Sequence, residues 1–305
     1  MPSRAETRGP SNPSMLSRIA ASEFTRDFLS NPSAVAGAII IVFALLVVLI
    51  GPHVVPQNPY DLKEINLADA YKPPIGFAGS SLKFPLGTDN QGRDILSSLV
   101  YGCRISLFIG IVGVLISCVV GTTLGLVSGY YGGKLDSLIM RIADIELSFP
   151  SILIALFMMS VFGRGIDKLL IALTAVSWVV YARTVRGDTL GVKAKEYVEA
   201  ARVIGLPDRI ILVRHVLPNV TTSIIVLSTL NVGGFILAEA TLSFLGVGVP
   251  VTRPSLGLLV KNGFDVLFSG YWWVAVFPGL FIMVLIFGIN LLGDFLKDEL
   301  NPRLK

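Results

Sequence analysis

The chain has 305 residues, of which 53% are apolar and 15% are charged, and its mean hydropathy is +0.72. Soluble domains carry about a quarter charged residues, so this composition excludes an ordinary soluble protein and favours one embedded in lipid. The net charge of +4 does not indicate nucleic-acid binding, because no basic stripe carries interleaved aromatic side chains.

Long uncharged runs predict an all-α, polytopic membrane protein with six transmembrane helices. A helix needs roughly 20 residues to cross a ~30 Å hydrocarbon core. In chain order the runs are 34–50, 105–133, 147–163, 169–182, 216–238 and 266–293. The fourth run is the shortest and has to extend at both ends to cross.

The runs divide the chain into four regions. We expect a polar N-terminal tail (1–30), a first transmembrane helix with a periplasmic segment (31–103), a core of five transmembrane helices (104–293) and a C-terminal tail (294–305). The core includes a polar loop at about 188–218. Most Lys and Arg residues lie in the two tails and in the loops after the second and fourth runs. This bias predicts that both termini face the cytoplasm.

Two local features are visible between the runs, a helix start and a tight turn. Asp94 is placed to cap a helix in which Ile95, Leu96, Leu99 and Val100 share one apolar face. We expect that helix to lie along the outer membrane surface and to lead into the second span. Further on, the Gly-Tyr-Tyr-Gly-Gly sequence at 129–133 predicts a tight turn on the cytoplasmic side, where glycine supplies positive φ angles.

The loop between the fourth and fifth runs has an organised pattern. Residues 193–204 predict a short helix, supported by Lys195, Glu199 and Arg202 at helical spacing. Gly205 stands where a left-handed residue ends a helix, and the next helix is expected to begin at Asp208 after a proline. A polar hairpin of this kind cannot enter lipid, so a push on it would move the two flanking spans together.

The same positions carry a family resemblance. The loop resembles the coupling loop of permease subunits of ATP-binding-cassette importers with the methionine-importer-like fold (the type I importer permease fold). The matching residues are Glu199, Ala200, Ala201, Gly205, Leu217 and Pro218. His215 departs from the isoleucine common in that family, and Arg-His-Val-Leu-Pro is similar to the dipeptide and oligopeptide branch.

Other segments resemble the C-type permease subunit of that branch. They are LGTDNQGRDILS at 86–97, GYYGGKLDSLIMRIADI at 129–145, AEATLSFLGVG at 238–248 and NLLGDFLKDELNPRLK at 290–305. The resemblance implies a bacterial inner-membrane subunit that forms half of a translocation pathway for di- and oligopeptides. It also implies a homologous second permease subunit, two ATPase subunits that bind ATP and Mg²⁺, and a periplasmic or lipid-anchored solute-binding protein.

Polar residues within the spans are candidates for the translocation path. Asn231 lies in the middle of the fifth span, and Glu239 lies near its outer end. An intramembrane carboxylate is a functional candidate by default, and here it would meet a substrate ammonium group. For Glu239, packing at a helix end or gate is the favoured interpretation, and a place on the path is the alternative. Asp144 and Glu146, near the start of the third span, predict a local charge network or a contact with the coupling loop.

Chemistry of its own is not expected from this chain. The nearest approach to a phosphate-binding loop, at 128–135, lacks the first glycine and the Ser/Thr of the motif. His53, His215, Cys103 and Cys118 lie too far apart in the sequence for a conventional metal centre. We therefore predict no catalytic residue, no metal and no cofactor on this chain.

Two alternatives remain open. The same machinery would serve a nickel chelate, glutathione, an opine or another small solute, because selectivity resides largely in the binding protein. An ion-coupled secondary transporter would instead work without ATPases and fail when the ion gradient is dissipated. The absence of an internal repeat disfavours that second alternative.

Overall fold

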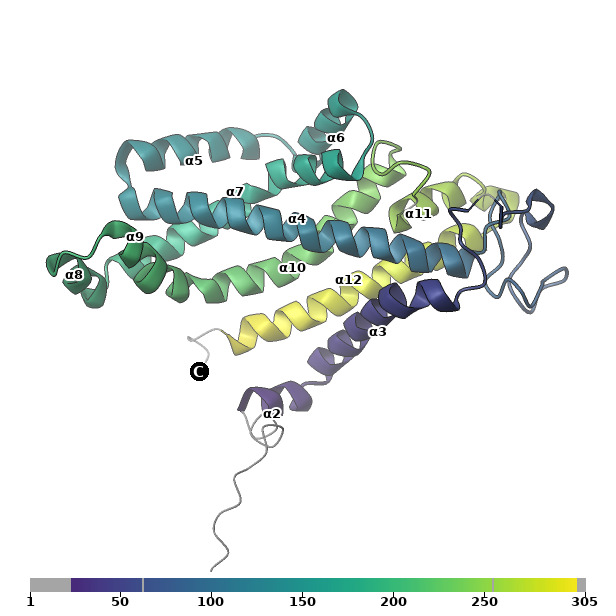
Figure 1. Cartoon of the computed structure of the whole chain (residues 1–305), viewed down its shortest axis with the longest axis horizontal. Coiled ribbons are helices and arrows are strands. Elements are labelled where there is room, and N and C mark those ends of the chain that lie inside the picture. The colour runs from purple at the N-terminus through teal and green to yellow at the C-terminus, as the bar shows by residue number, and fades with distance from the viewer. Residues whose placement is uncertain (1–22, 62, 254, 301–305) are drawn as a thin grey trace, which may run out of the picture.

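The apolar runs form helices that lie side by side along the long axis of the molecule (Figure 1). The computed structural model describes residues 23–61, 63–253 and 255–300. Across these ranges every regular element is helical, and β-pairing is limited to one isolated bridge between Thr88 and Asp94. The prediction of an all-α membrane protein is confirmed.

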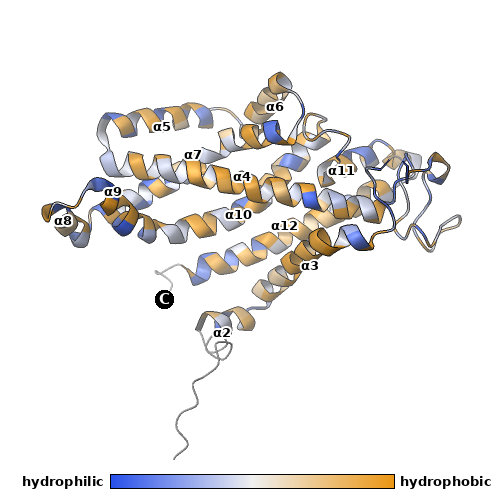
Figure 2. Cartoon of the chain, in the orientation of Figure 1, coloured by the Kyte–Doolittle hydropathy of each residue, from blue (hydrophilic) through white to orange (hydrophobic). Residues whose placement is uncertain are grey.

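Within the part of the chain that the structure describes, five helices are long and apolar enough to span a membrane. They are α3 (Pro32–Val54), α4 (Ile95–Tyr131), α7 (Ile166–Lys193), α10 (Leu217–Phe244) and α12 (Trp273–Glu299). The shorter elements are α2 (Glu23–Ser30), η1 (Leu67–Asp69), α5 (Gly133–Leu147), α6 (Ser151–Phe162), α8 (Glu196–Val203), α9 (Asp208–Ile211), η2 (Leu212–Val216), α11 (Leu256–Phe264) and η3 (Leu267–Ser269). In Figure 2 the middles of α3 and α4 are strongly hydrophobic, whereas polar residues gather toward the ends of the bundle.

The third span is built differently from the expectation. The uncharged run 147–163 does not form one helix, because the chain breaks before Pro150 and α5 and α6 meet at 87°. Proline has no N–H and disfavours a helical conformation in the residue before it. Helix α6 has 12 residues, about 18 Å, which is too short to cross alone. Six spans are therefore reached by counting the bent pair as one span, and that span begins in the charged helix α5.

Helix α4 also differs from the expectation, since no separate surface helix precedes it. It runs unbroken for 37 residues from Ile95, and the Asp94 side chain caps it by accepting a 2.8 Å bond from the Ser97 N–H. Burial raises the pKa of the Asp94 carboxyl, although the bonds from Ser97 oppose this shift. Ile95 and Leu99 lie inside the apolar core, so this first turn packs within the protein instead of resting on the membrane surface.

Other predicted boundaries shift as well. Helix α7 extends to Lys193, and α12 extends to Glu299, so residues 294–299 are helix and not a tail. Gly132 and Gly133 have the expected positive φ angles of 67° and 58°, but the preceding residues of that predicted turn belong to α4. Residues 1–22 and 301–305 of the predicted tails lie outside the described residues.

Helices α4 and α7 make the most extensive contact of any helix pair among the described residues, and small residues allow their backbones to approach. A Cβ atom on Gly121 would lie 2.4 Å from the Trp178 carbonyl oxygen, and one on Gly125 would lie 2.6 Å from the Ala182 carbonyl oxygen. In lipid, where apolar burial gives little driving force, such close backbone contact is what holds helices together.

The segment 55–94 covers one end of the bundle. It is pinned to the start of α12, where the Trp273 indole donates to the Thr88 carbonyl oxygen at 3.1 Å. The rings of Tyr71 and Tyr271 stack at 3.9 Å between centroids. A buried ion pair joins Arg93 to Asp89 at 2.7 Å. Helix α8 lies at the opposite end, so the molecule has an α8 end and a 55–94 end (Figure 1).

Candidate coupling site and translocation path

Two residues separate the end of α7 from the start of α8, and α8 ends in a Schellman motif. Gly205 has φ +81°, its N–H donates to the Arg202 carbonyl oxygen at 3.0 Å, and the Leu206 N–H donates to the Ala201 carbonyl oxygen at 3.1 Å. These are the two bonds that define this helix ending. Gly205 therefore lies just past the helix end, as predicted from its position.

The side-chain pairs expected within α8 do not form. Among the described residues, Glu199 makes no ion pair with Lys195 or Arg202, and it is exposed. Arg202 instead lies over the Tyr130 ring, 5.5 Å from its centroid. The hydrogen bond with Tyr130 raises the pKa of Arg202, which keeps the guanidinium charged.

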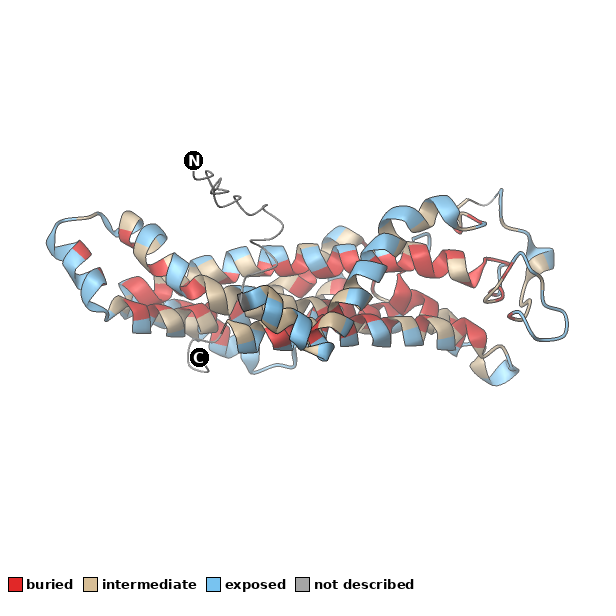
Figure 3. Ribbon diagram, turned by 90° about the horizontal axis from the view of Figure 1, so that it is seen from below, coloured by how far each residue is buried: buried red, intermediate tan, exposed pale blue. Residues whose placement is uncertain are grey.

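Helix α8 presents an apolar face to its surroundings. Tyr197, Val203 and Ile204 are 41%, 86% and 76% exposed. Ala200 belongs to the same exposed face, whereas Ala201 points inward and is 4% exposed. Figure 3 shows α8 at one tip of the molecule with most of its surface exposed. The two predicted alanines thus have different roles, one on the surface and one in the packing beneath it.

Beneath this face, α8 rests on a compact apolar cluster. Ala201 and Val198 pack with Ile211 and Val216, and Leu217 lies against the same group. Pro218 is exposed at the start of α10, and the backbone just before it adopts a π-helical turn. Helices α9, η2 and α10 continue as one rod from Asp208 to Phe244, so the helix begins at Asp208 as predicted and is longer than the uncharged run 216–238.

Tyr130 connects this loop to the rest of the bundle, and the sequence argument missed it. Its hydroxyl donates to the Asp208 carboxylate at 2.6 Å, and its backbone carbonyl oxygen accepts from the Lys193 ammonium. Asp208 therefore pairs with Tyr130 instead of capping α9, whose preceding residue is Pro207. One side chain at the end of α4 thus touches α7, α8 and α9. The Gly-rich turn around it was the available signal.

Glu239, predicted on the translocation path, is buried inside this chain. Its carboxylate accepts from the Ser106 hydroxyl at 2.9 Å and from the Ser243 hydroxyl at 2.6 Å. Ser106 also accepts from the Leu256 N–H at 3.3 Å, so the cluster joins α4, α10 and α11. The side chain is fully enclosed, which makes it a packing link between three helices in this conformation.

Asn231 has a different environment. It lines a cavity of about 270 Å³ between α6, α7 and α10, together with Ser151 and Ser177. Its amide NH₂ donates to the Leu227 carbonyl oxygen at 2.9 Å. Asn231 therefore keeps its place as a predicted path residue, and Glu239 does not share this cavity.

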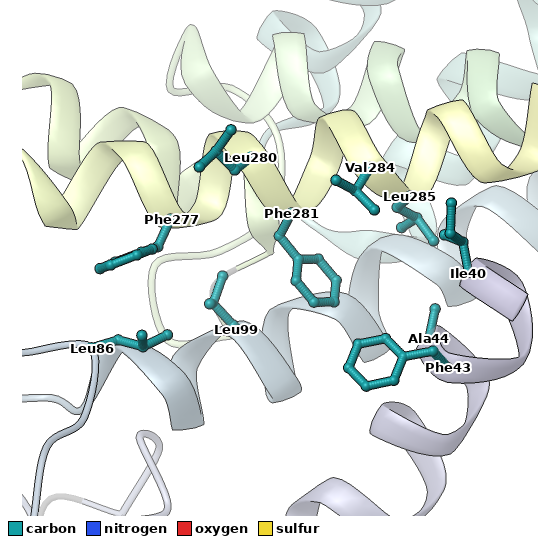
Figure 4. Close-up of a pocket in the computed structure, with 10 residues that line it drawn as sticks. All are labelled: Ile40, Phe43, Ala44, Leu86, Leu99, Phe277, Leu280, Phe281, Val284 and Leu285. Carbon is teal, nitrogen blue, oxygen red and sulfur yellow. The ribbon is translucent and has the colours of Figure 1, made fainter. Parts of the chain in front are cut away.

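A second hollow of about 280 Å³ lies between α3, α4 and α12 (Figure 4). The side chains that line it are all apolar, among them Phe43, Leu99 and Phe281. Solute sites need a few convergent polar groups to orient a ligand, so this hollow does not suit a peptide. Within the described ranges no three His, Cys, Asp or Glu side chains gather as a metal site, and the absence of a cofactor stays a prediction.

Comparison with protein families gives two matches. Residues 121–305 match the binding-protein-dependent transport system inner membrane component, and residues 21–74 match the N-terminal TM domain of oligopeptide transport permease C.

Individual relatives agree with these matches. The dipeptide transport system permease protein DppC of Bacillus subtilis is 37% identical over 280 residues, covering 92% of this chain and 85% of its own length. The oligopeptide permease protein OppC of the same organism is 39% identical, covering 91% and 88%. The glutathione permease protein GsiD of Pectobacterium atrosepticum is 38% identical, covering 93% and 91%. Among solved structures, an inward-facing MetNI methionine ABC transporter matches 67% of this chain and 96% of its own chain, with TM-score 0.55 and 21% identity, which shows a common fold.

Proposed function

The chain belongs to the family of binding-protein-dependent transport system inner membrane components, and on this premise we propose that it forms half of a translocation pathway for di- and oligopeptides. It is the permease subunit of an ATP-binding-cassette transporter, and ATP hydrolysis belongs to separate subunits. The proposed assembly contains this chain, a homologous second permease, two ATPase subunits and a solute-binding protein.

The observation that carries the proposal is the exposed apolar face of α8. Val203 and Ile204 lie side by side at this helix end, and adjoining exposed apolar side chains of this kind are typical of a surface that a partner covers. In the proposed mechanism the ATPase binds this face from the cytoplasm. Movement of α8 then passes through Tyr130 to α4 and through Asp208 into the α10 rod. The 55–94 end faces outward and receives the solute-binding protein.

The test replaces Val203 with Asp in the co-expressed complex. We expect the chain to insert normally but to lose its ATPase subunits on purification, because a carboxylate would enter an apolar contact. Leu82→Asp is the matched control, since Leu82 is 87% exposed at the other end and Val203 is 86% exposed. If both variants retain the ATPase equally, α8 is not the docking surface.

A second variant separates docking from coupling. A Cβ on Gly205 would meet no described atom within 4 Å, so substitution there is opposed mainly by the positive φ angle. Gly205→Val is expected to leave expression intact while ATP hydrolysis no longer drives uptake. Full transport by this variant would show that the loop is not the lever.

Glutathione is the second candidate cargo, because GsiD is as similar to this chain as the peptide permeases are. Mass spectrometry of the ligand bound to the cognate solute-binding protein distinguishes the two cargoes. Uptake by purified complex in liposomes, with and without ATP, distinguishes both from an ion-coupled carrier.

A further inference from the structure

Helix α5 has one face that this chain leaves uncovered. The side of α5 that meets α4 and α7 buries Ile139 and Ala143. Large apolar residues occupy the other side, with exposed fractions between 42% and 60%. These residues, here called the α5 stripe, are Leu135, Leu138, Ile142 and Ile145.

The spacing of the α5 stripe is that of a helix-packing seam. Its members follow one another at intervals of three, four and three residues, which keeps their side chains along one side of the helix. Residues spaced in this way lie along one line of a helix and fit between the side chains of a second helix that crosses at about 20°. From Leu135 to Ile145 the stripe is about 15 Å long.

Lipid alone does not suit this face. Lys134 and Arg141 are exposed at its border, and basic side chains are unfavourable against the lipid core. Helix α3 gives the contrast within the same chain. It exposes Ile39, Val42 and Phe43 on a helix that has no Lys, Arg, Asp or Glu, as expected for a surface that meets acyl chains.

Water does not suit the face either, because it is a contiguous apolar surface. Helix α5 lies alongside the spanning helices α4 and α7, and its 15 residues extend about 22 Å along them (Figure 1). A soluble domain cannot follow the stripe along that depth. The occupant therefore has to be a protein helix that is itself embedded in the membrane.

Resting on the proposed function, we propose that the α5 stripe binds a transmembrane helix of the second permease subunit. The basic border at Lys134 and Arg141 would face acidic or hydroxyl side chains of that helix. On its opposite side α5 is tied to α7, since Arg186 donates two bonds to Asp136, at 2.5 and 2.7 Å, and Arg183 pairs with Asp144. The interface would thus lie one helix away from the residues below α8.

A photo-crosslinking amino acid at Leu138 or Ile142, one at a time, tests the proposal in the co-expressed full complex. We expect both positions to crosslink to the second permease subunit. Ser137 is the matched control, because it is exposed on α5 next to Leu138 but lies off the stripe. It should give little or no such product.

A second measurement does not depend on the crosslinker. Ile142→Asp is expected to lose the co-purified second permease, whereas Ser137→Asp keeps it. If the second permease co-purifies with every variant and no crosslink forms from the stripe, or only lipid adducts appear, the interface is overturned while the proposed function stands. A transport-active complex with no second permease overturns both.

Discussion

Tyr130 shows how much of the coupling geometry depends on one side chain. It is 3% exposed, yet its hydroxyl, ring and carbonyl oxygen each contact a different segment of the loop. The bond from its hydroxyl to Asp208 connects it to the rod that continues into α10, and its ring belongs to the same apolar cluster as Ile211 and Val216. The other contacts hold the ring and backbone against α8 and α7.

Removing that hydroxyl is expected to weaken coupling without unfolding the protein. In Tyr130→Phe the ring remains, and the lost hydrogen bond is worth about 1 kcal/mol. We predict that less peptide is taken up per ATP hydrolysed, measured in liposomes that contain the complete complex. Tyr131→Phe is the control, since Tyr131 is 51% exposed, and it should behave as the parent. Equal coupling in both variants would contradict the role of Tyr130.

Glu239 is expected to act through stability rather than through contact with cargo. Gln can accept from one serine and donate to the other, so Glu239→Gln should keep uptake per folded chain. Leu leaves Ser106 and Ser243 without their partner, at a cost of about 1–3 kcal/mol for each buried group. The midpoint temperature of thermal unfolding in detergent should therefore be lower for Glu239→Leu than for the parent. Loss of uptake by a stable Glu239→Gln variant would return this residue to the path.

These two residues mark the limit of what sequence predicts at this scale. Gly205 was placed correctly because a helix ending is a local pattern. The surroundings of Glu239 were not, because Ser106 lies 133 residues away and reaches it through tertiary packing alone. Tyr130 was missed for the same reason, as Asp208 is 78 positions from it.

At the scale of elements, hydropathy predicted the number of spans better than their ends. Uncharged runs stop at the first charge, but helices continue while their backbone bonds are satisfied. Helix α4 therefore begins nine residues before Arg104, and α12 continues past Asp294. The bend between α5 and α6 was not predicted, because α5 carries charged residues that pair with Arg186 and Trp178 of α7. Such a helix does not look like a membrane span in the sequence.

Close contact between α3 and α12 depends on two glycines. A Cβ on Gly37 would lie 2.8 Å from the Gly288 carbonyl oxygen and 2.9 Å from the Leu292 nitrogen. Gly37→Ala should therefore separate the two helices and destabilise the purified protein by roughly 1–3 kcal/mol, the usual cost of overpacking. The midpoint of thermal unfolding in detergent measures this.

Gly279→Ala provides the comparison on α12, because a Cβ there meets no atom within 4 Å. Alanine also favours the helix over glycine by up to about 1 kcal/mol. This control should be neutral or slightly stabilising. A Gly37→Ala protein as stable as the control would show that α3 is free to move away from α12.

At the scale of the whole molecule, the two ends have different chemistry. The 55–94 end is a folded cap. Aromatic stacking of Tyr71 on Tyr271 holds it against the start of α12, and a buried ion pair lies within it. The α8 end is a short exposed helix over a small apolar cluster. In the proposed transporter these ends face opposite sides of the membrane, and the distribution of Lys and Arg predicts that the α8 end faces the cytoplasm.

Thiol labelling of the chain expressed alone tests that direction. In a parent with Cys103 and Cys118 replaced by Ala, Leu82→Cys should react with a membrane-impermeant reagent added to intact cells. Val203→Cys should react only after the membrane is opened. Labelling of Val203→Cys in intact cells would place α8 outside and contradict the proposed function.

The unbroken rod from Asp208 to Phe244 has a mechanical consequence. Its 37 residues are about 55 Å long, and its far half is anchored to α4 and α11 through Glu239. A rigid helix of that length, tilted by about 10°, displaces one end relative to the other by roughly 10 Å. If it pivots near that anchor, which lies five residues from Phe244, the Asp208 end moves by about 8 Å and the Phe244 end by only about 1 Å, so a push on α8 would change the width of the pathway mainly at the α8 end.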